Sequence, residues 1–535
     1  MDYDAIVIGA GFGGLYALKR LRDDLGLKTH LYEQGTGVGG TWYWNKYPGA
    51  MSDTRSHLYC YSFDKELLQA DNFKQHYRLQ PEVRTYLENF SKRYDLYKDI
   101  STSTEIAGAI WDNDANCWEL ELADGQKVTA RFVVTALGLL SKPNIPPFEG
   151  LDTFKGELVH TSRWAADTTW KGKRVGVIGT GSTGVQVITA IAPDVKHLTV
   201  FQRSPQYSVP SGNGFMDPDH INQIKENYNE IWDQEKKTIT VFGAKESNVS
   251  AHDVTPEERE RIFEEAWADG GGFRFMFGTF NDIILDEEAN KYAQDFIRSK
   301  IRQIIKDPAK AEKLIPLDLY AKRPLCDAGY YQQFNRENVD VIDVKANPIA
   351  RLDGNSVILE DGQAVELDML ILATGFDAGD GNYMRLKLAG ADGVSIQDHW
   401  KDGARSFLGL MAANFPNMFM INGPGGAFAN QPPAIELYVD MAAELIAETI
   451  KRDATAIEAK ETAEAMWYET CIDLTNATIL PKAKSWILGA NIPGKPLSLN
   501  FYMGGYSKYK DVLEEVRSSG YDHFSFHNLA PIEAH

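Results

Sequence analysis

Two stretches of the chain repeat one pattern of apolar and polar positions. Each has a short apolar run (residues 3–8 and 174–178) followed by a glycine-rich turn, Gly9–Gly14 or Gly179–Gly184. Apolar residues then recur at helical spacing: Leu15, Leu18 and Leu21 in the first stretch, and Val185, Ile188 and Ile191 in the second. A buried run, a tight turn and a helical stripe in this order predict a strand–turn–helix unit at both places.

Each unit is followed by a second set of shared signals. Asp-Gly pairs at 124–125 and 361–362 lie between strand-like runs, which predicts two β-hairpins. Apolar runs at 130–138 and 367–375 then end at a glycine. The shared order indicates an internal structural repeat, and we predict an α/β fold with two Rossmann-like dinucleotide-binding domains.

A long region between the halves of the second unit is helical in pattern. The segment Thr255-Pro256-Glu257-Glu258 is a capping box with proline at the first helical position. An apolar stripe then precedes Pro308 and consists of Phe296, Ile297, Ile301, Ile304 and Ile305. We therefore predict a helical insertion over residues 218–325.

A charged residue follows each glycine turn at the same distance, and the two charges are opposite. Glu33 and Arg203 each lie 19 positions past the last glycine of their turn. A carboxylate there accepts hydrogen bonds from a bare ribose, whereas a guanidinium binds a ribose 2′-phosphate. The first turn is therefore predicted to bind FAD and the second NADPH. The alternative is a pair of packing glycines in ordinary βαβ units, which the matched spacing disfavours.

These assignments predict how the chain is divided. The FAD-binding domain is expected to comprise residues 1–142 and 386–535, the latter with the C-terminal loops. Residues 143–150 are proline-rich and are expected to form a linker. The NADP-binding domain is expected to comprise residues 151–217 and 326–380, on either side of the helical insertion.

Composition limits the class of protein. The chain has 535 residues and a net charge of −20, from 75 acidic and 55 basic residues, which disfavours nucleic acid and anionic membranes as partners. Its four cysteines form no CxxC pair, which argues against a disulfide reductase and a zinc ribbon, and we expect no metal. Without a signal sequence or an apolar run of 18 residues, we expect a cytoplasmic protein, and a monomer.

Several motifs together resemble a known family. Phe154–Trp164 has the spacing Phe-x-Gly-x-x-x-His-x-x-x-Trp, and further matches lie at 39–53, 322–327, 372–377 and 485–495. Through these motifs the sequence resembles the type I Baeyer–Villiger flavin monooxygenases, and most of all the cyclohexanone monooxygenases. Related N-hydroxylating flavin monooxygenases usually lack the closing tryptophan, so this residue favours the Baeyer–Villiger family.

The resemblance implies a reaction and two catalytic residues. NADPH would reduce FAD, O₂ would form a flavin C4a-peroxide, and the peroxide would convert a ketone into an ester or lactone, with sulfoxidation as a side activity. The peroxide must stay anionic to attack the ketone, and a fixed cation stabilises its negative charge. The family places this cation at Arg323 and its orienting carboxylate at Asp53. A structural ion pair is the plainer interpretation of these residues. An N- or S-oxygenating flavin monooxygenase, which does not need the pair, is the alternative function.

The turns and the matched motifs also predict contacts to the two cofactors. The predicted residues are Gly9, Gly11, Phe12, Gly14, Glu33, Gly40, Thr41, Trp42, Asp53, Gly179, Thr180, Gly181, Ser182, Thr183, Gly184, Gln186, Arg203, Ser204, Lys322 and Trp486. Thr180, Ser182, Thr183 and Gln186 are expected near a pyrophosphate. The family implies that Lys322 meets the nicotinamide nucleotide and that Trp486 closes on it; a half-buried loop aromatic is the alternative for Trp486.

The family also implies a substrate pocket, lined by Leu139, Phe242, Phe275, Phe428, Ala429, Gln431 and Phe501. Cyclohexanone-type members are expected to carry threonine and leucine where this chain has Ala429 and Gln431. A smaller residue enlarges the pocket and glutamine adds a polar wall, so we expect bulkier ketones or aryl sulfides as substrates. His160 and Trp164 are expected to couple an interdomain linker to the domains rather than to catalyse, with a satisfied structural histidine as the alternative for His160.

Overall fold

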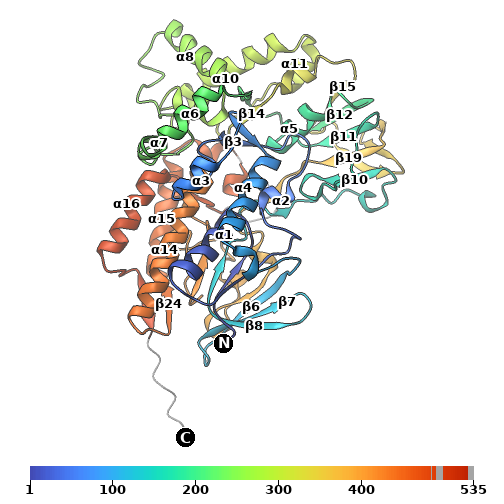
Figure 1. Cartoon of the computed structure of the whole chain (residues 1–535). Coiled ribbons are helices and arrows are strands. Elements are labelled where there is room, and N and C mark those ends of the chain that lie inside the picture. The colour runs from blue at the N-terminus through green and yellow to red at the C-terminus, as the bar shows by residue number, and fades with distance from the viewer. Residues whose placement is uncertain (484, 490–497, 528–535) are drawn as a thin grey trace.

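The computed structural model describes residues 1–483, 485–489 and 498–527. The first glycine turn follows a strand inside a sheet with the order β21-β6-β7-β8-β1-β2-β5, seen at the lower end of Figure 1, and β22 pairs with the end of β8. Its strands are β1 (Tyr3–Ile8), β2 (Thr29–Tyr32), β5 (Ile100–Ser101), β6 (Ile106–Asp112), β7 (Cys117–Leu122), β8 (Lys127–Thr135), β21 (Lys387–Ala389) and β22 (Met418–Met420).

The second glycine turn follows a strand of a parallel sheet with the order β10-β19-β11-β12-β15, on the right of Figure 1. Its strands are β10 (Glu157–His160), β11 (Arg174–Ile178), β12 (His197–Gln202), β15 (Val339–Asp343) and β19 (Met369–Leu372). The apolar runs 3–8 and 174–178 thus form central strands, in which the side chains of residues 5–8 and 175–178 are buried on both faces. The predicted α/β class is confirmed.

Helices cover the sheets and form a separate layer at the top of Figure 1. They are α1 (Phe12–Lys19), α2 (Thr41–Trp44), α3 (Lys65–Ala70), α4 (Gln80–Arg93), α5 (Ser182–Ile191), α6 (Pro218–Glu226), α7 (Tyr228–Glu235), α8 (Pro256–Asp269), α9 (Gly272–Gly278), α10 (Glu287–Ile304), α11 (Pro308–Leu314), α12 (Tyr330–Gln333), α13 (Ile396–His399), α14 (Gln431–Lys451), α15 (Glu461–Asn476) and α16 (Gly505–Ser518). Among the described residues, no helix is both long and apolar enough to cross a bilayer.

The turn and capping signals form the predicted local structures. The Asp-Gly pair at 124–125 joins the antiparallel strands β7 and β8, and the pair at 361–362 joins β17 (Ser356–Leu359) to β18 (Ala364–Glu366). Thr255 caps α8, because its hydroxyl accepts a hydrogen bond from the Glu258 N–H at 3.3 Å. Both predicted hairpins and the predicted helix start are therefore confirmed.

Short strand pairs complete the structure and place the segments that matter below. They are β3 (Met51–Arg55) with β4 (Tyr77–Leu79), β9 (Lys142–Pro143) with β20 (Phe376–Asp377), β13 (Ser208–Pro210) with β14 (Leu325–Asp327), β16 (Ile349–Asp353) with β17, β23 (Gly426–Ala427) with β25 (Phe501–Tyr502), and β24 (Ala456–Ala459) with β26 (Phe524–His527). The proline-rich segment predicted as a linker therefore begins in a strand pair with the end of the second unit.

Candidate functional site

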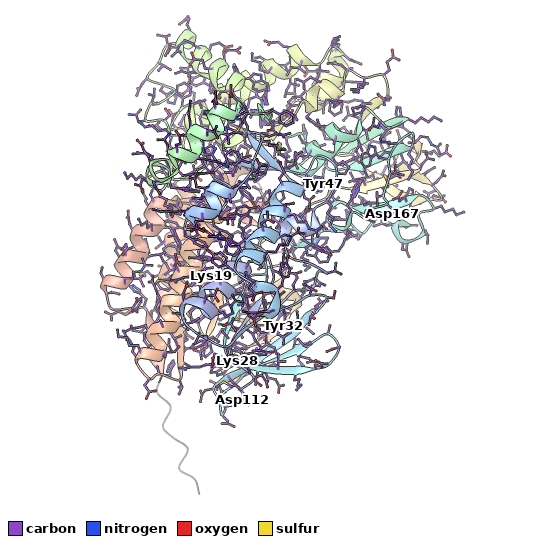
Figure 2. All side chains as sticks on the ribbon, in the orientation of Figure 1. Lys19, Lys28, Tyr32, Tyr47, Asp112 and Asp167 are labelled. Carbon is purple, nitrogen blue, oxygen red and sulfur yellow. The ribbon has the colours of Figure 1, made fainter. Side chains whose placement is uncertain are left out.

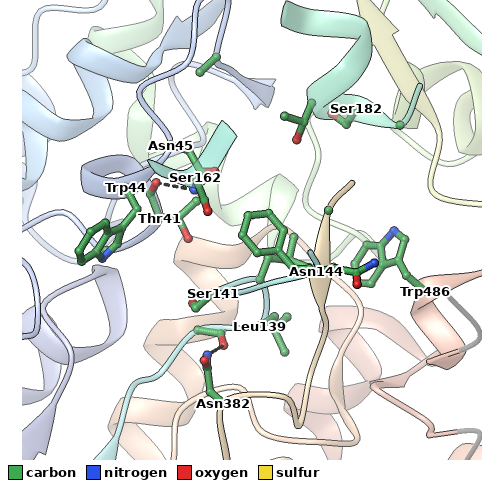
Figure 3. Close-up of a pocket in the computed structure, with 18 of the residues that line it drawn as sticks. Thr41, Trp44, Asn45, Leu139, Ser141, Asn144, Ser162, Ser182, Asn382 and Trp486 are labelled. Atoms are coloured by element: carbon green, nitrogen blue, oxygen red, sulfur yellow. Dashed lines mark hydrogen bonds between the residues drawn. The ribbon is translucent and has the colours of Figure 1, made fainter. Parts of the chain in front are cut away.

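A single cavity of about 980 Å³ runs from one glycine turn to the other. Figure 3 shows part of it, with Leu139, Ser182 and Trp486 contributed by distant parts of the chain. Both turns reach it from the carboxyl ends of parallel strands, the place where open α/β sheets bind ligands. All but five of the predicted site residues line this cavity; the exceptions are Gly14, Gly184, Phe275, His160 and Trp164.

The first turn has the shape that close approach of a ligand requires. Gly9 has φ +102°, and a Cβ there would lie 2.5 Å from the carbonyl oxygen of Ala136. Gly11 lines the cavity at the start of α1, where backbone N–H groups have no partner within the helix. Gly14 does not line the cavity, because it lies under the turn, where a Cβ would be 1.7 Å from the Gly9 oxygen. Its role is packing, which corrects its assignment as a ligand contact.

Glu33 is held at the cavity by the backbone around it. Its carboxylate accepts hydrogen bonds from the N–H of Ala10 at 2.7 Å and of Gly35 at 2.6 Å. Burial raises the pKa of Glu33, and the two backbone hydrogen bonds act in the opposite direction. Each carboxylate oxygen has a further lone pair, so the geometry fits acceptance of ribose hydroxyls.

The second turn repeats the first. Gly179 has φ +108°, and a Cβ there would lie 2.4 Å from the Ala373 oxygen, while a Cβ at Gly184 would lie 2.1 Å from the Gly179 oxygen. At Gly181 a Cβ would meet no atom within 4 Å, so this glycine faces open space in the cavity. Gly184, like Gly14, packs under the turn and does not line the cavity.

Arg203 and Ser204 lie at the cavity beyond this turn. The Thr180 hydroxyl donates a hydrogen bond to the Ser204 carbonyl at 3.1 Å and so joins the turn to the end of β12. Arg203 is exposed and has no carboxylate partner among the described residues. A guanidinium without a carboxylate partner is available at this place for an anionic group.

An ion pair lines the cavity. The Arg323 guanidinium donates to the Asp53 carboxylate, and its central carbon lies 5.6 Å from the centre of the Phe273 ring. Asp53 belongs to β3, and Arg323 directly precedes Pro324 and β14. The carboxylate of Asp327, the last residue of β14, accepts hydrogen bonds from the Ser208 hydroxyl at 2.5 Å and from two backbone N–H groups at 2.7 Å. This anchor fixes the strand that directly follows Arg323 and Pro324.

Aromatic rings form a wall beside this ion pair. Phe242 and Phe273 stack with ring centres 3.7 Å apart, and Phe428 meets Phe273 edge-on at 6.3 Å. Phe501 lies 5.5 Å from Phe428, and Trp486 lies 6.1 Å from Phe501. Together these rings give one side of the cavity an apolar surface.

The prediction that Phe275 lines the pocket is wrong. Phe273 lines it instead, and Phe275 packs on the opposite side against Phe263 and Phe296. Both phenylalanines belong to α9, and positions two apart in a helix face away from each other because each residue turns the chain by about 100°.

Leu139, Ala429 and Gln431 line the cavity near the same wall. Gln431 is the first residue of α14, and its amide is already engaged: it donates to the Ala429 carbonyl at 3.1 Å and accepts from the Asn422 amide. These two hydrogen bonds hold the glutamine side chain in one orientation at the wall of the cavity.

Two predicted nucleotide contacts have partners within the protein. The amide of Gln186 bonds to the Tyr47 hydroxyl at 2.7 Å and to the Met51 carbonyl at 3.1 Å, and Lys322 bonds to Asp318 at 2.7 Å. Trp486 lines the cavity, but residues 490–495 of the matching motif 485–495 lie outside the described part of the chain.

His160 and Trp164 lie outside the cavity. His160 ends the edge strand β10, so the expectation that it lies on a linker is wrong. Its Nδ1 lies 2.8 Å from the Ser162 hydroxyl, and burial lowers its pKa to about 4, which leaves the ring neutral at pH 7. Trp164 is buried and meets Trp170 edge-on at 6.0 Å.

Sequence reasoning missed several residues that line the cavity. Trp44, Asn45 and Tyr47 lie inside the motif 39–53, and Figure 3 shows the Asn45 amide bonded to the Thr41 carbonyl, at 2.9 Å. Asn382 also lines it, and donates to the carbonyls of Leu137 and Gly138 at 3.0 and 3.1 Å. The first three could have been found from the motif, whereas the last had no sequence signal.

Comparisons with known proteins agree with this geometry. The family model described as pyridine nucleotide-disulphide oxidoreductase matches residues 3–229. A cyclohexanone 1,2-monooxygenase of Acinetobacter sp. is 53% identical over 98% of this chain and 96% of its own length. A Baeyer–Villiger monooxygenase of Pseudooceanicola batsensis is 50% identical over 97% and 95%. A phenazine N-monooxygenase of Lysobacter antibioticus is 47% identical over 98% and 97%.

A solved structure extends this similarity to the whole fold. The crystal structure of cyclohexanone monooxygenase from Rhodococcus sp. Phi1 bound to NADP⁺ superposes with a TM-score of 0.97. It is 51% identical in sequence, and the match covers 98% of this chain and 99% of that one.

Proposed function

From the premise that this chain belongs to the flavin-dependent Baeyer–Villiger monooxygenases, we propose that Arg323 and Asp53 are the catalytic pair with which it oxygenates a bulky ketone. The net reaction converts ketone, O₂, NADPH and a proton into an ester or lactone, NADP⁺ and water. The observation that carries the proposal is the ion pair in the wall of the one cavity that joins both glycine turns.

FAD and NADPH are the cofactors, and the turns fit them. When bound, FAD takes electrons from NADPH and activates O₂. The chain's own contribution begins with binding: the turns at Gly11 and Gly181, which line the cavity, admit pyrophosphates, Glu33 accepts ribose hydroxyls, and Arg203 binds a 2′-phosphate. The first turn would bind a ribose without a phosphate and the second a ribose with a 2′-phosphate. This difference explains why a carboxylate follows the first turn and a guanidinium the second.

Arg323 supplies a charge that no working pH removes. A guanidinium keeps its proton, so it stabilises negative charge that develops on oxygen without giving up a proton itself. Asp53 orients the guanidinium from one side, and Phe273 lies close to it. The aromatic wall keeps water from this place and strengthens the electrostatic interaction.

The pocket residues support a preference for bulky substrates. We expect that Ala429→Thr combined with Gln431→Leu shifts selectivity toward cyclohexanone by about tenfold, because a smaller, less polar cavity fits a small ring better. The measurement is the ratio of kcat/KM for cyclohexanone to kcat/KM for a bulky aryl ketone in both proteins. A parent enzyme that strongly prefers cyclohexanone contradicts the proposal.

Arg203 should set the choice between the two nicotinamide cofactors. We expect Arg203→Ala to raise KM for NADPH roughly 10- to 100-fold, the worth of a charge-assisted hydrogen bond, and to leave KM for NADH unchanged. Steady-state kinetics with both cofactors measure this, and NADH serves as the internal control. Equal losses with both cofactors contradict a 2′-phosphate role.

Isotope labelling tests the proposed reaction as a whole. The purified enzyme is incubated with NADPH, a ketone panel and ¹⁸O₂, and mass spectrometry follows the products. One labelled oxygen in an ester or lactone supports the proposal. Oxygenated amines or sulfides without any ester favour the alternative function, an N- or S-oxygenating flavin monooxygenase. One of the relatives is a phenazine N-monooxygenase, so this alternative is included in the test. We expect sulfoxidation as a side activity only.

We propose further that the enzyme is a cytoplasmic monomer in which residues 1–142 and 386–535 bind FAD and residues 151–217 and 326–380 bind NADP. The pairing of β21 and β22 with the first sheet supports the first assignment. The four cysteines are buried and unpaired, which suits a reducing compartment. Size-exclusion chromatography with light scattering tests the monomer.

A further inference from the structure

A short strap between α2 and β3 packs against the helix of the second glycine turn. The strap is residues 47–51, and Figure 2 shows Tyr47 between the ribbons of the two units. At Gly49, with φ +80°, a Cβ would lie 2.7 Å from the Gln186 carbonyl oxygen in α5, so only glycine allows this approach. The two units therefore touch directly beside the cavity.

The side chain of Gln186 binds this strap at both ends. Its carbonyl oxygen accepts a hydrogen bond from the Tyr47 hydroxyl at 2.7 Å, and its amide donates to the Met51 carbonyl at 3.1 Å. Gln186 is 6% exposed and Tyr47 is 9% exposed, so water competes little for these bonds. Burial raises the pKa of the Tyr47 hydroxyl to about 12, so it keeps its proton as a donor at ordinary pH.

The strap leads directly to the ion pair. Met51 is the first residue of β3, and Asp53 follows two positions later, about 6.6 Å along an extended strand. Arg323 reaches the same ion pair from the segment just before β14, which pairs with β13, the strand that follows β12 along the chain. The two charges thus come from different parts of the chain, Asp53 from the first predicted domain and Arg323 from the end of the predicted helical insertion, and their separation depends on how these parts are held together.

Resting on the proposed function, we propose that Gln186 is a positioning residue: through Tyr47 and Met51 it fixes Asp53 relative to Arg323. This role differs from the pyrophosphate contact expected from its place in the second turn. Its side-chain oxygen and one amide N–H already have protein partners that fix its orientation, whereas Ser182 and Thr183 line the cavity within the turn itself. The helix that receives NADPH is thereby linked to the catalytic pair.

Variants of this hydrogen-bonded link test the proposal. Gln186→Ala and Tyr47→Phe should each raise the ratio of H₂O₂ to ester by about fivefold. Small displacements of catalytic groups lower the rate of the reaction that they promote, so more of the reducing power ends in H₂O₂. Tyr47→Phe should add little to Gln186→Ala in the double variant, because the bond is already lost. The dissociation constant of NADP⁺, measured by tryptophan fluorescence, should stay within about twofold of the parent value.

The control is Thr189→Ala, on the same helix, whose hydroxyl bonds only within α5, to the Val185 carbonyl at 2.6 Å. It should leave both the product ratio and NADP⁺ binding unchanged. If the NADP⁺ dissociation constant rises strongly for Gln186→Ala alone, Gln186 contacts the nucleotide directly and the proposal is wrong. Unchanged product ratios in both variants overturn the proposal. A parent enzyme that forms no ester defeats the proposed function instead, and fluorescence binding still reports on Gln186.

Discussion

Replacing Arg323 with alanine is expected to abolish ester formation while NADPH oxidation continues and ends in H₂O₂. Arg323 lines the cavity and pairs with Asp53, and its loss leaves Asp53 as an unpaired negative charge there. Removing one fixed electrostatic contact to a developing oxyanion typically costs about 10²–10³-fold in rate, and a leftover carboxylate adds repulsion. The measurement is the ester and H₂O₂ yield per NADPH consumed.

Two further variants separate charge from geometry. Arg323→Lys keeps the charge but not the planar fork that binds a carboxylate, so it should retain a small part of the ester yield. Asp53→Asn should leave NADPH binding intact and lower the ester yield, because the guanidinium is no longer oriented. Full ester formation by the alanine variant would show that another group stabilises the reacting oxygen.

Replacing two glycines of the second turn with alanine, one at a time, should cause two different defects: one loss of stability and one loss of NADPH affinity. At Gly184 a Cβ would lie 2.1 Å from the Gly179 oxygen, so Gly184→Ala should destabilise the fold by about 3 kcal/mol. At Gly181 the Cβ position is open and the backbone is already extended, with φ −75° and ψ −171°. Gly181→Ala should therefore fold normally, yet raise KM for NADPH by roughly tenfold, because the methyl group occupies space the pyrophosphate needs.

Thermal unfolding and steady-state kinetics on the same samples measure both effects. FAD binding provides the control, because neither glycine belongs to the first turn. Gly14→Ala should show the same steric failure there, with a Cβ 1.7 Å from the Gly9 oxygen. Normal NADPH kinetics in Gly181→Ala would mean that the ligand does not approach this backbone.

Sequence patterns predicted the parts of this protein that obey local rules. The two strand–turn–helix units follow from apolar periodicity and from glycines that only a tight turn requires, and both hairpins follow from Asp-Gly pairs. Sequence patterns did not predict which face of α9 lines the cavity. This helix begins at Gly272 without a capping side chain, so nothing local showed that Phe273 rather than Phe275 faces the cavity.

Partners distant in sequence account for the other differences. His160 ends β10, a four-residue strand that exists because β19 lies beside it, more than 200 residues later. The engagement of Gln186 by Tyr47 likewise depends on how two units meet, 139 positions apart in sequence. Neither contact has a local signature, since tertiary packing decides both.

The place of β22 has a consequence for biosynthesis. This strand lies against the end of β8, and Tyr16 of α1 donates a hydrogen bond to Asp440 of α14 at 2.7 Å. β22 leaves the ribosome about 280 residues after β8. At a translation rate of about 5–20 residues per second, the carboxyl end of β8 therefore lacks this strand partner for roughly 15–60 s. The nascent N-terminal half is therefore expected to engage chaperones, and stalled or shortened chains should be degraded rather than accumulate as a free flavin-binding half.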